Sequence, residues 1–500
     1  MNTNLKRIIP AVLCFVLLIS SALQATALQT GDSYLYDDWG RSLPAPTPYI
    51  AVAELGGEDF HSSPLNAPKD MFVSAANNIY IADTENNRIV VLNENFEMIR
   101  EIDEVFSPDE RNTLNKPEGV FVDGAETVYI CDTGNGRVIA LNGANEVTRL
   151  ITRPQTELMG EKDEFRPVKA AADSAGYVYV ACYGLYQGLA CYNERDEFSS
   201  FFGSNKVELT LSTMATYYWK QIFSKAQAES MTRLIPAEYS NLFIDKENFI
   251  YTSTVSTESS LQEIKKLNAA GVNVLHISGY NTAFAKDDYG DIEKEWVKGR
   301  FEDSKMVDVN VDGDGVIAAL DSSRGRIFGY DGESNLLFVF GNIGDRTGEF
   351  FTPVALEKAG ENYLVLDSTK NTVTVFSPTG YMNDVRAATV LYSQGRYIDS
   401  MDLWQNILKY NSNFSLAYRS IGRAYLQQHD YKTAMQYLKK GNDRRQYSLA
   451  LTGYRKQFLT NYFLYIAGAV VLLYFVCKYL YRKLRKKLGL PVKKKKTIYR

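Results

Sequence analysis

The chain has 500 residues and a formal net charge of −4 at pH 7. An acidic balance argues against a nucleic-acid partner. Its five cysteines are too few for a disulfide scaffold. Only three histidines occur, and one of them, His429, lies in the helical part of the chain, which argues against a three-histidine zinc site.

The N-terminus has the pattern of a secretory signal. Lys6 and Arg7 precede an apolar run at residues 8–24, and a small-x-small sequence follows at 25–27. We therefore predict a signal peptide over residues 1–27, with an uncleaved anchor as the alternative. Residues 28–48, which contain a proline-rich stretch, are expected to form an exposed lead-in.

A repeat with a period of about 49 residues follows. Pro68, Asp83 and Arg88 in one copy correspond to Pro117, Asp132 and Arg137 in the next. Each copy reads as a strand, a turn, a strand ending in aspartate, a tight bend and a further strand. Six copies occur, which begin near residues 68, 117, 167, 236, 306 and 353. The pattern predicts a mainly β fold, a six-bladed propeller over residues 49–380.

The copy at residues 117–141, "PEGVFVDGAETVYICDTGNGRVIAL", resembles the NHL repeat. Because the aspartate ends one strand and the arginine begins the next, we expect them to form an ion pair that holds the bend. The last copy has Thr372 opposite Asp367, and the third has Cys182 in place of the aspartate. The expected structural pairs are Asp83–Arg88, Asp132–Arg137 and Asp321–Arg326.

Residues 49–55 precede the first copy and have no blade of their own, so we predict that they supply the fourth strand of the last blade. Two insertions interrupt the repeats, a helical one at 205–235 and another at 279–301. They are expected either to carry binding specificity or to cap the propeller. Cys182 and Cys191 are expected on adjacent strands, as a disulfide or as free thiols.

The period changes after the propeller. Tyr397 and Tyr431 are 34 residues apart, and residues 385–457 resemble two tetratricopeptide repeats, with a generic helical bundle as the alternative. Residues 459–481 are apolar and long enough to span a bilayer. Lysine and arginine but no acidic residue occur in the tail at 482–500. The positive-inside rule then predicts a type I membrane protein with a cytoplasmic tail.

No catalytic motif stands out, and no cofactor or metal is expected. The sequence at residues 311–315, "VDGDG", lacks the distal glutamate of an EF-hand. Three residues that follow or flank the proline of their copies are candidates for a binding surface on one channel face: Glu118, Lys169 and Glu238.

Together these features predict a membrane-anchored extracytoplasmic binding or scaffold protein of bacterial type. Its propeller is expected to bind a protein, peptide or glycan, and its helical repeats to contact a membrane partner such as a transport permease. The alternative is a hydrolase or lyase of lactonase type, which acts at the channel face. Convergent carboxylates at the channel mouth would favour the enzyme, and an aromatic, uncharged rim would favour binding.

Overall fold

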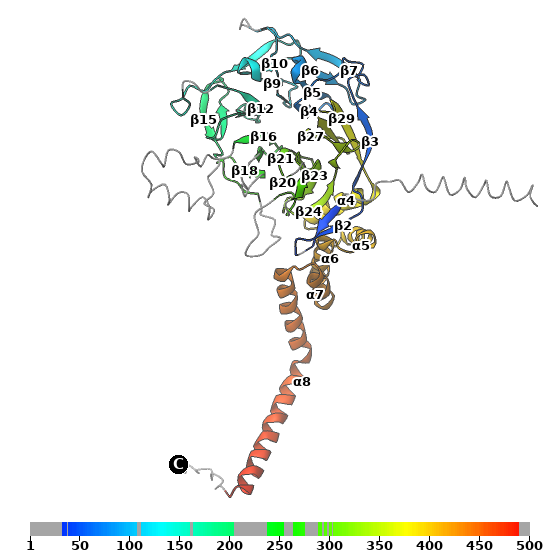
Figure 1. The fold of residues 1–500 in the computed structure, drawn as a ribbon. Helices are drawn as coiled ribbons and strands as arrows, with labels where there is room; N and C mark the ends of the chain where they lie inside the picture. The colour runs from blue at the N-terminus through cyan, green and yellow to red at the C-terminus, as the bar shows by residue number, and fades with distance from the viewer. Residues whose placement is uncertain are drawn as a thin grey trace, which may run out of the picture. The chain divides into compact units, whose positions relative to one another are not determined.

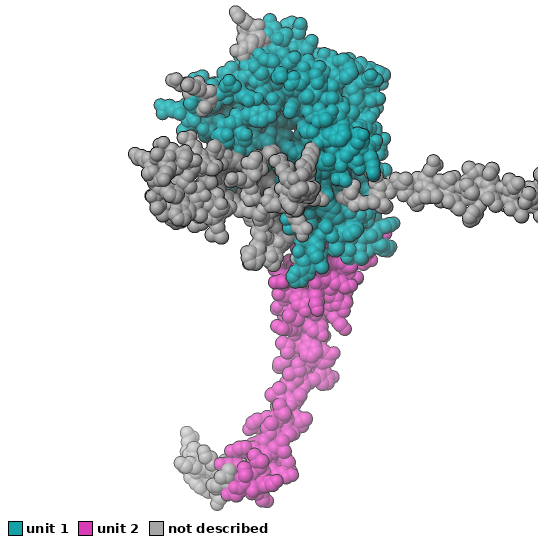
Figure 2. Space-filling model, in the orientation of Figure 1, with its two compact units in different colours: residues 1–393, 407–413 teal, residues 394–406, 414–500 magenta. Residues whose placement is uncertain are grey.

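The computed structural model describes residues 33–37, 39–107, 112–160, 164–204, 238–254, 264–275, 289–292, 295–297, 300–302 and 304–489. The predicted signal peptide and the insertion at 205–235 lie outside these residues, as does most of the insertion at 279–301. The chain divides into two compact units near Ser393, and Ile407–Asn413 group with the larger one (Figure 2).

The larger unit is a six-bladed propeller (Figure 1). The innermost strand of each blade contacts the innermost strand of the next, and the last contacts the first, so the ring is closed. Blade four has three strands within the described part of the chain and the other blades have four. From blade one to blade three the strands are β4 (Asp70–Val73), β5 (Ile79–Asp83), β6 (Arg88–Leu92), β7 (Met98–Ile102), β8 (Gly119–Val122), β9 (Val128–Asp132), β10 (Arg137–Leu141), β11 (Val147–Ile151), β12 (Pro167–Ala172), β13 (Val178–Cys182), β14 (Leu189–Tyr192) and β15 (Phe198–Phe202).

The remaining blades follow in chain order. Their strands are β16 (Tyr239–Ile244), β17 (Ile250–Thr254), β18 (Ile264–Leu267), β21 (Met306–Val311), β22 (Ile317–Asp321), β23 (Arg326–Tyr330), β24 (Leu336–Phe340), β27 (Pro353–Ala359), β28 (Asn362–Asp367) and β29 (Thr372–Pro378). Three small two-stranded sheets lie outside the blades: β1 (Tyr34–Tyr36) with β2 (Ser42–Pro44), β19 (Glu295–Val297) with β20 (Arg300–Glu302), and β25 (Asn342–Ile343) with β26 (Glu349–Phe350).

The ring closes through an N-terminal strand. β3 (Tyr49–Leu55) pairs antiparallel with β29, so the first propeller strand completes the last blade. This confirms the predicted closure. The pairing covers the edge that β29 would otherwise expose.

The hydrophobic core lies between neighbouring blades. One cluster joins blades one and two, another joins two and three, and a third joins six and one. Both faces of a blade are therefore covered, which explains why middle strands such as β5, β6, β9 and β10 are buried along their whole length.

The repeated aspartate anchors the segment that enters its blade. Asp83 accepts hydrogen bonds from the backbone N–H of Asn66 at 2.7 Å and from Arg88 Nε at 2.7 Å. Asp132 accepts the equivalent bonds from Asn115 at 2.8 Å and from Arg137 at 2.7 Å. The bend between each pair is a single 3-10 turn that ends in a left-handed residue, Asn87 in one copy and Gly136 in the other.

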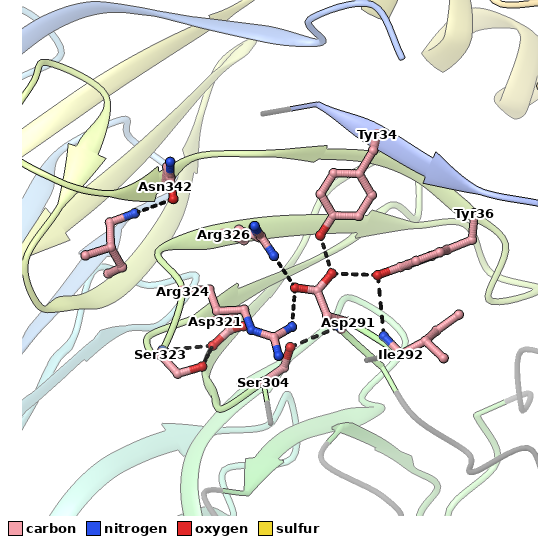
Figure 3. A network of polar contacts seen from close by, with 12 residues as sticks. Tyr34, Tyr36, Asp291, Ile292, Ser304, Asp321, Ser323, Arg324, Arg326 and Asn342 are labelled. Atoms are coloured by element: carbon pink, nitrogen blue, oxygen red, sulfur yellow. Dashed lines mark hydrogen bonds and ion pairs between the residues drawn. The ribbon is translucent and has the colours of Figure 1, made fainter. Parts of the chain in front are cut away.

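In the fifth copy the partner of Arg326 is Asp291 rather than Asp321. Asp321 and Arg326 lie opposite each other in the strand register, as predicted. Asp321 binds the entering backbone through the N–H of Lys305 at 2.9 Å, whereas Arg326 forms its ion pair with Asp291 (Figure 3). In this blade Asp321 therefore still binds the backbone of the entering segment, but it does not form the predicted ion pair with Arg326.

Helix α4 (Gly380–Ser393) belongs to the propeller unit, and its Arg386 forms ion pairs with Asp312 at 2.8 Å and Asp314 at 2.6 Å. The other helices are α5 (Met401–Tyr410), α6 (Ser415–Gln427), α7 (Tyr431–Lys440) and α8 (Arg444–Lys487). α6 packs closely on α7, because a Cβ atom on Gly422 would lie 2.6 Å from Leu438 Cγ.

One described helix, α8, is long and apolar enough to cross a membrane, by length and composition. It has 44 residues, and its most apolar window has a mean hydropathy of 2.0 with no residue buried inside the protein. Its N-terminus is capped by Asp443, whose side chain accepts from the backbone N–H of Gln446.

Candidate binding site at the channel mouth

The innermost strands place a charged cluster on the propeller axis. Lys169 of β12 in blade three donates to both carboxylate oxygens of Asp70 in blade one, at 2.7 and 2.6 Å. These blades are not neighbours, so the ion pair crosses the channel. Both side chains are buried. Asp308 of β21 and Glu357 of β27 are also buried and interact electrostatically with Lys169.

Two of the axial carboxylates also bond the backbone of the following blade. Asp70 accepts from the N–H of Val120 at 2.8 Å, and Asp308 accepts from the N–H of Leu356 at 2.7 Å. These bonds satisfy inner-strand donors and tie successive blades together.

Burial is the main influence on the ionisation of this cluster. It raises the pKa of Asp308 to about 7, and repulsion from Asp70 adds to the effect while Lys169 opposes it. It also raises the pKa of Glu357 well above its ordinary value. Burial alone would lower the pKa of Lys169, but attraction to the three carboxyl groups raises it. One ammonium group cannot balance three carboxylates in a buried site, so the cluster retains a proton near neutral pH.

A pocket of about 870 Å³ opens next to this cluster. It is lined by the ends of the innermost strands and by the turns that follow them. Five of the lining residues lie on innermost strands, two positions further along the strand than the layer that contains Asp70 and Lys169. They are three phenylalanines and two polar residues: Phe72, Phe121, Phe243, Asn310 and Glu357. We call this set the floor and the whole cavity the mouth pocket.

Four turns around the mouth pocket each begin with an aspartate that fixes the turn. Asp123 accepts from the backbone N–H groups of Ala125 and Thr127 at 2.8 and 2.9 Å. The other three make the same pair of bonds within their own turns: Asp173, Asp245 and Asp312. The rim therefore carries carboxylates in fixed positions.

The structure separates the three residues that the sequence singled out. Lys169 lies in the axial cluster. Glu118 and Glu238 precede their inner strands, at the opposite end of the channel from the mouth pocket, and are half-buried. There they contact adjacent residues of one loop: Tyr183 donates to Glu118 at 2.9 Å, and the N–H of Gly184 donates to Glu238. This loop also lines a cavity of about 320 Å³.

Sequence reasoning missed most of the axial set: Asp70, Asn241, Asp308, Asn310 and Glu357. A signal was present, because Asp70 and Lys169 both stand two residues after the proline that opens their copies. Gly119 occupies the same position in blade two, where a Cβ atom would lie 2.2 Å from the carbonyl oxygen of Val168. An alignment of the copies on their opening proline therefore identifies the axial positions of blades one to three, whereas in blade four it points to Glu238 instead of Asn241.

Among the described residues, no group of three or more histidine, cysteine, aspartate or glutamate side chains is placed to hold a metal ion. Asp70 already directs both of its oxygens to Lys169. Cys131, Cys182 and Cys191 are buried free thiols, so the possible Cys182–Cys191 disulfide is not formed. Burial raises the pKa of Cys191 to about 11, which makes it a poor nucleophile at neutral pH.

No protein-family model matches the chain, and no curated protein matches it. Solved structures with a similar fold include virginiamycin B lyase from Staphylococcus aureus, at 11% identity and a TM-score of 0.36 over 65% of this chain and 87% of that one. A gluconolactonase from Xanthomonas campestris aligns at 10% identity and a TM-score of 0.38, over 71% and 99% of the two chains. A protein of unknown function from Bacteroides thetaiotaomicron aligns at 11% identity and a TM-score of 0.37, over 69% and 75%.

Similarities this low carry no argument about activity. The resemblances to NHL and tetratricopeptide repeats likewise remain predictions.

Proposed function

We propose that the protein is a membrane-anchored extracytoplasmic binding protein, and that the mouth pocket of its propeller takes a protein, peptide or glycan ligand. The position of Lys169 carries the proposal. A propeller of lactonase type would use axial carboxylates to chelate a metal. Here an ammonium group occupies that place, and the carboxylate oxygens bond the backbones of neighbouring blades.

The mouth pocket has the properties of a recognition site. Its volume of about 870 Å³ lies within the usual range for ligand pockets. Aromatic rings and fixed carboxylates line it together, a combination that suits ligands with both apolar faces and polar groups. Because its turns are held by internal hydrogen bonds, the site is largely formed before a ligand arrives.

The anchor follows from the two ends of the chain. The signal sequence directs export, α8 crosses the membrane, and the basic tail stays in the cytoplasm. The helical unit would then hold the propeller outside the cell and contact a membrane partner such as a permease. Protease treatment of intact cells tests this arrangement. It should degrade the propeller and leave a protected C-terminal fragment, and full protection of the chain would contradict it.

Peptide and glycan arrays probed with the full-length protein test the binding role. A true ligand should be retained by the wild-type protein and lost by the mouth variant Phe243→Ala. An Asn95→Ala variant, which changes an exposed residue of blade one outside the pocket, is the matched control. If Phe243→Ala retains the ligand as well as the wild type does, a binding site at the mouth pocket is contradicted.

One observation favours the alternative function, a hydrolase or lyase of lactonase type. Glu357 is a protonatable carboxyl group that lines the mouth pocket, and a general acid requires such a group. A screen of lactone and lyase substrates with the wild-type protein and Glu357→Gln tests it. Turnover that Glu357→Gln abolishes would establish the enzyme and displace the binding proposal.

A further inference from the structure

The floor of the mouth pocket contains an unsatisfied acceptor. Asn310 is 4% exposed and donates through Nδ2 to Glu357 Oε2 at 2.9 Å. Its other terminal atom, Oδ1, is buried and has no hydrogen-bond partner among the described residues. A buried acceptor without a partner destabilises the protein, because it has lost its hydrogen bonds to water. A donor group on a ligand in the pocket would remove that destabilisation.

The charges around the floor favour a cation. Glu357 faces Lys169, Asp308 and Asp70, and Lys169 is the cation that these three carboxyl groups share. The surrounding rim carries more acids than bases, since five carboxyl groups and three lysines line it: Asp123, Asp173, Asp245, Glu247 and Asp312, against Lys246, Lys266 and Lys358. Asp312 is already paired with Arg386, and the other four carboxyl groups still outnumber the lysines. A second positive charge at the floor would offset one of the buried carboxylates that Lys169 does not balance.

The aromatic part of the floor suits the same group. The rings of Phe72 and Phe121 pack edge to face with centroids 5.0 Å apart, and Phe243 lines the pocket with them. Aromatic faces attract cations through the negative charge of the ring face. They also accept an apolar stem. A quaternary ammonium would satisfy the rings but would leave Asn310 Oδ1 without a donor.

We propose that the floor formed by Asn310, Glu357 and the three phenylalanines binds a primary ammonium group carried on an aliphatic or sugar stem. The ammonium donates to Asn310 Oδ1 and the Glu357 carboxyl group, and its stem packs on the rings. The inference rests on the proposed binding function and names the chemistry that the site recognises. A lysine side chain of a peptide and an amino sugar of a glycan are the two sources of such a group.

Titration of the full-length protein with small probes tests this directly. n-Butylammonium represents the lysine side chain, and n-butanol and butyltrimethylammonium are its neutral and quaternary controls. Glucosamine, with glucose as its control, represents the sugar source. At least one amine should bind about ten-fold or more tightly than its controls, because a hydrogen bond to a charged group contributes about that factor.

Two variants locate the effect. Asn310→Leu keeps the side-chain size, removes the unsatisfied acceptor and should weaken amine binding about ten-fold, with the thermal midpoint measured to verify folding. Asn95→Leu, which makes the same change at an exposed residue of blade one outside the pocket, is the matched control and should leave amine binding unchanged. Equal affinity for the amines and their neutral controls would overturn the proposal.

Proton release gives a readout that needs no variant. A cation beside Glu357 favours its ionised form, so binding near neutral pH should release protons, seen as different heats in phosphate and HEPES, two buffers without a primary amine. Binding without release would contradict contact with the carboxyl cluster. If the amines do not bind but the binding of an array ligand is lost in Phe243→Ala, this inference is wrong and the proposed binding function stands. If no ligand is found whose binding requires a residue of the mouth pocket, both proposals are wrong.

Discussion

Lys169 in blade three and Asp70 in blade one form an ion pair across the propeller channel, with Lys169 Nζ 2.6 Å from Asp70 Oδ2. The two side chains are 6% and 5% exposed, so the pair is shielded from water and salt. Together with Asp308 and Glu357 it links non-adjacent blades at the centre of the ring. We interpret it as the structural support for the floor of the mouth pocket.

Replacing Lys169 with methionine should destabilise the propeller strongly. The change would leave three buried carboxyl groups without a cation, and breaking a buried ion pair typically costs about 3–5 kcal/mol. Urea denaturation measures the loss. Lys246→Met, at an exposed position, should stay within about 0.5 kcal/mol of the wild type. If Asp70→Asn is added to Lys169→Met and restores none of the lost stability, the ion-pair explanation is wrong.

The axial cluster should make stability depend on pH. The pKa of Asp308 is raised to about 7 in the folded protein, whereas it lies near 4 in an unfolded chain. Between these two pH values Asp308 is protonated in the folded state but not in the unfolded state. Its stabilising contribution is therefore fully present below about pH 4 and is lost as the pH rises through 7. As the pH rises from 4.5 to 8, the thermal midpoint of Asp308→Asn should therefore fall less steeply than that of the wild type. Glu94→Gln, at an exposed carboxylate, should follow the wild-type curve.

The repeat aspartates should differ in importance between blades. Asp83→Ala removes the bond to Asn66 and leaves the buried Arg88 without its closest carboxylate. Asp321→Ala removes a similar backbone bond, but Arg326 keeps Asp291. The Asp83 variant should therefore be less stable than the Asp321 variant by roughly 1–3 kcal/mol. Equal losses in urea denaturation would show that the backbone bond alone matters.

The N-terminal hairpin β1–β2 should depend on Asp291. Its carboxylate receives hydrogen bonds from Tyr34 and Tyr36 of β1 and ion pairs from Arg324 and Arg326 of blade five (Figure 3). In Asp291→Asn, amide hydrogen exchange should increase over residues 33–45 and change little in blades one to three. Tyr36→Phe, which removes the bonds of its hydroxyl to Asp291 and Ile292 but leaves both ion pairs of Asp291, should have a smaller effect. Unchanged exchange at the hairpin would contradict this anchoring.

The sequence was sufficient for the architecture. The 49-residue period specified the blades, and the orphan strand at 49–55 specified how the ring closes. Such features are local or repetitive, and each copy adds evidence for the others. The buried thiols were left open between two states, and the structure has them free.

The site was harder to predict because its residues differ from blade to blade. Asp70, Lys169 and Asp308 occupy equivalent places but have different side chains, so no motif repeats. Lys169 was singled out, but its partner Asp70 lies 99 residues away and nothing in either local sequence couples them. The contact between Asp291 and Arg326 depends on an insertion that lies outside the repeat, and this explains why Asp321 was expected as the partner.

The most direct test of the binding function is to recover the ligand after binding. The full-length protein would be saturated with an array ligand that depends on Phe243, dialysed to equilibrium, and the bound and free ligand identified by mass spectrometry. The account predicts about one ligand per chain, recovered chemically unchanged. Conversion of the ligand to a product, abolished by Glu357→Gln, would contradict it and identify the propeller as an enzyme.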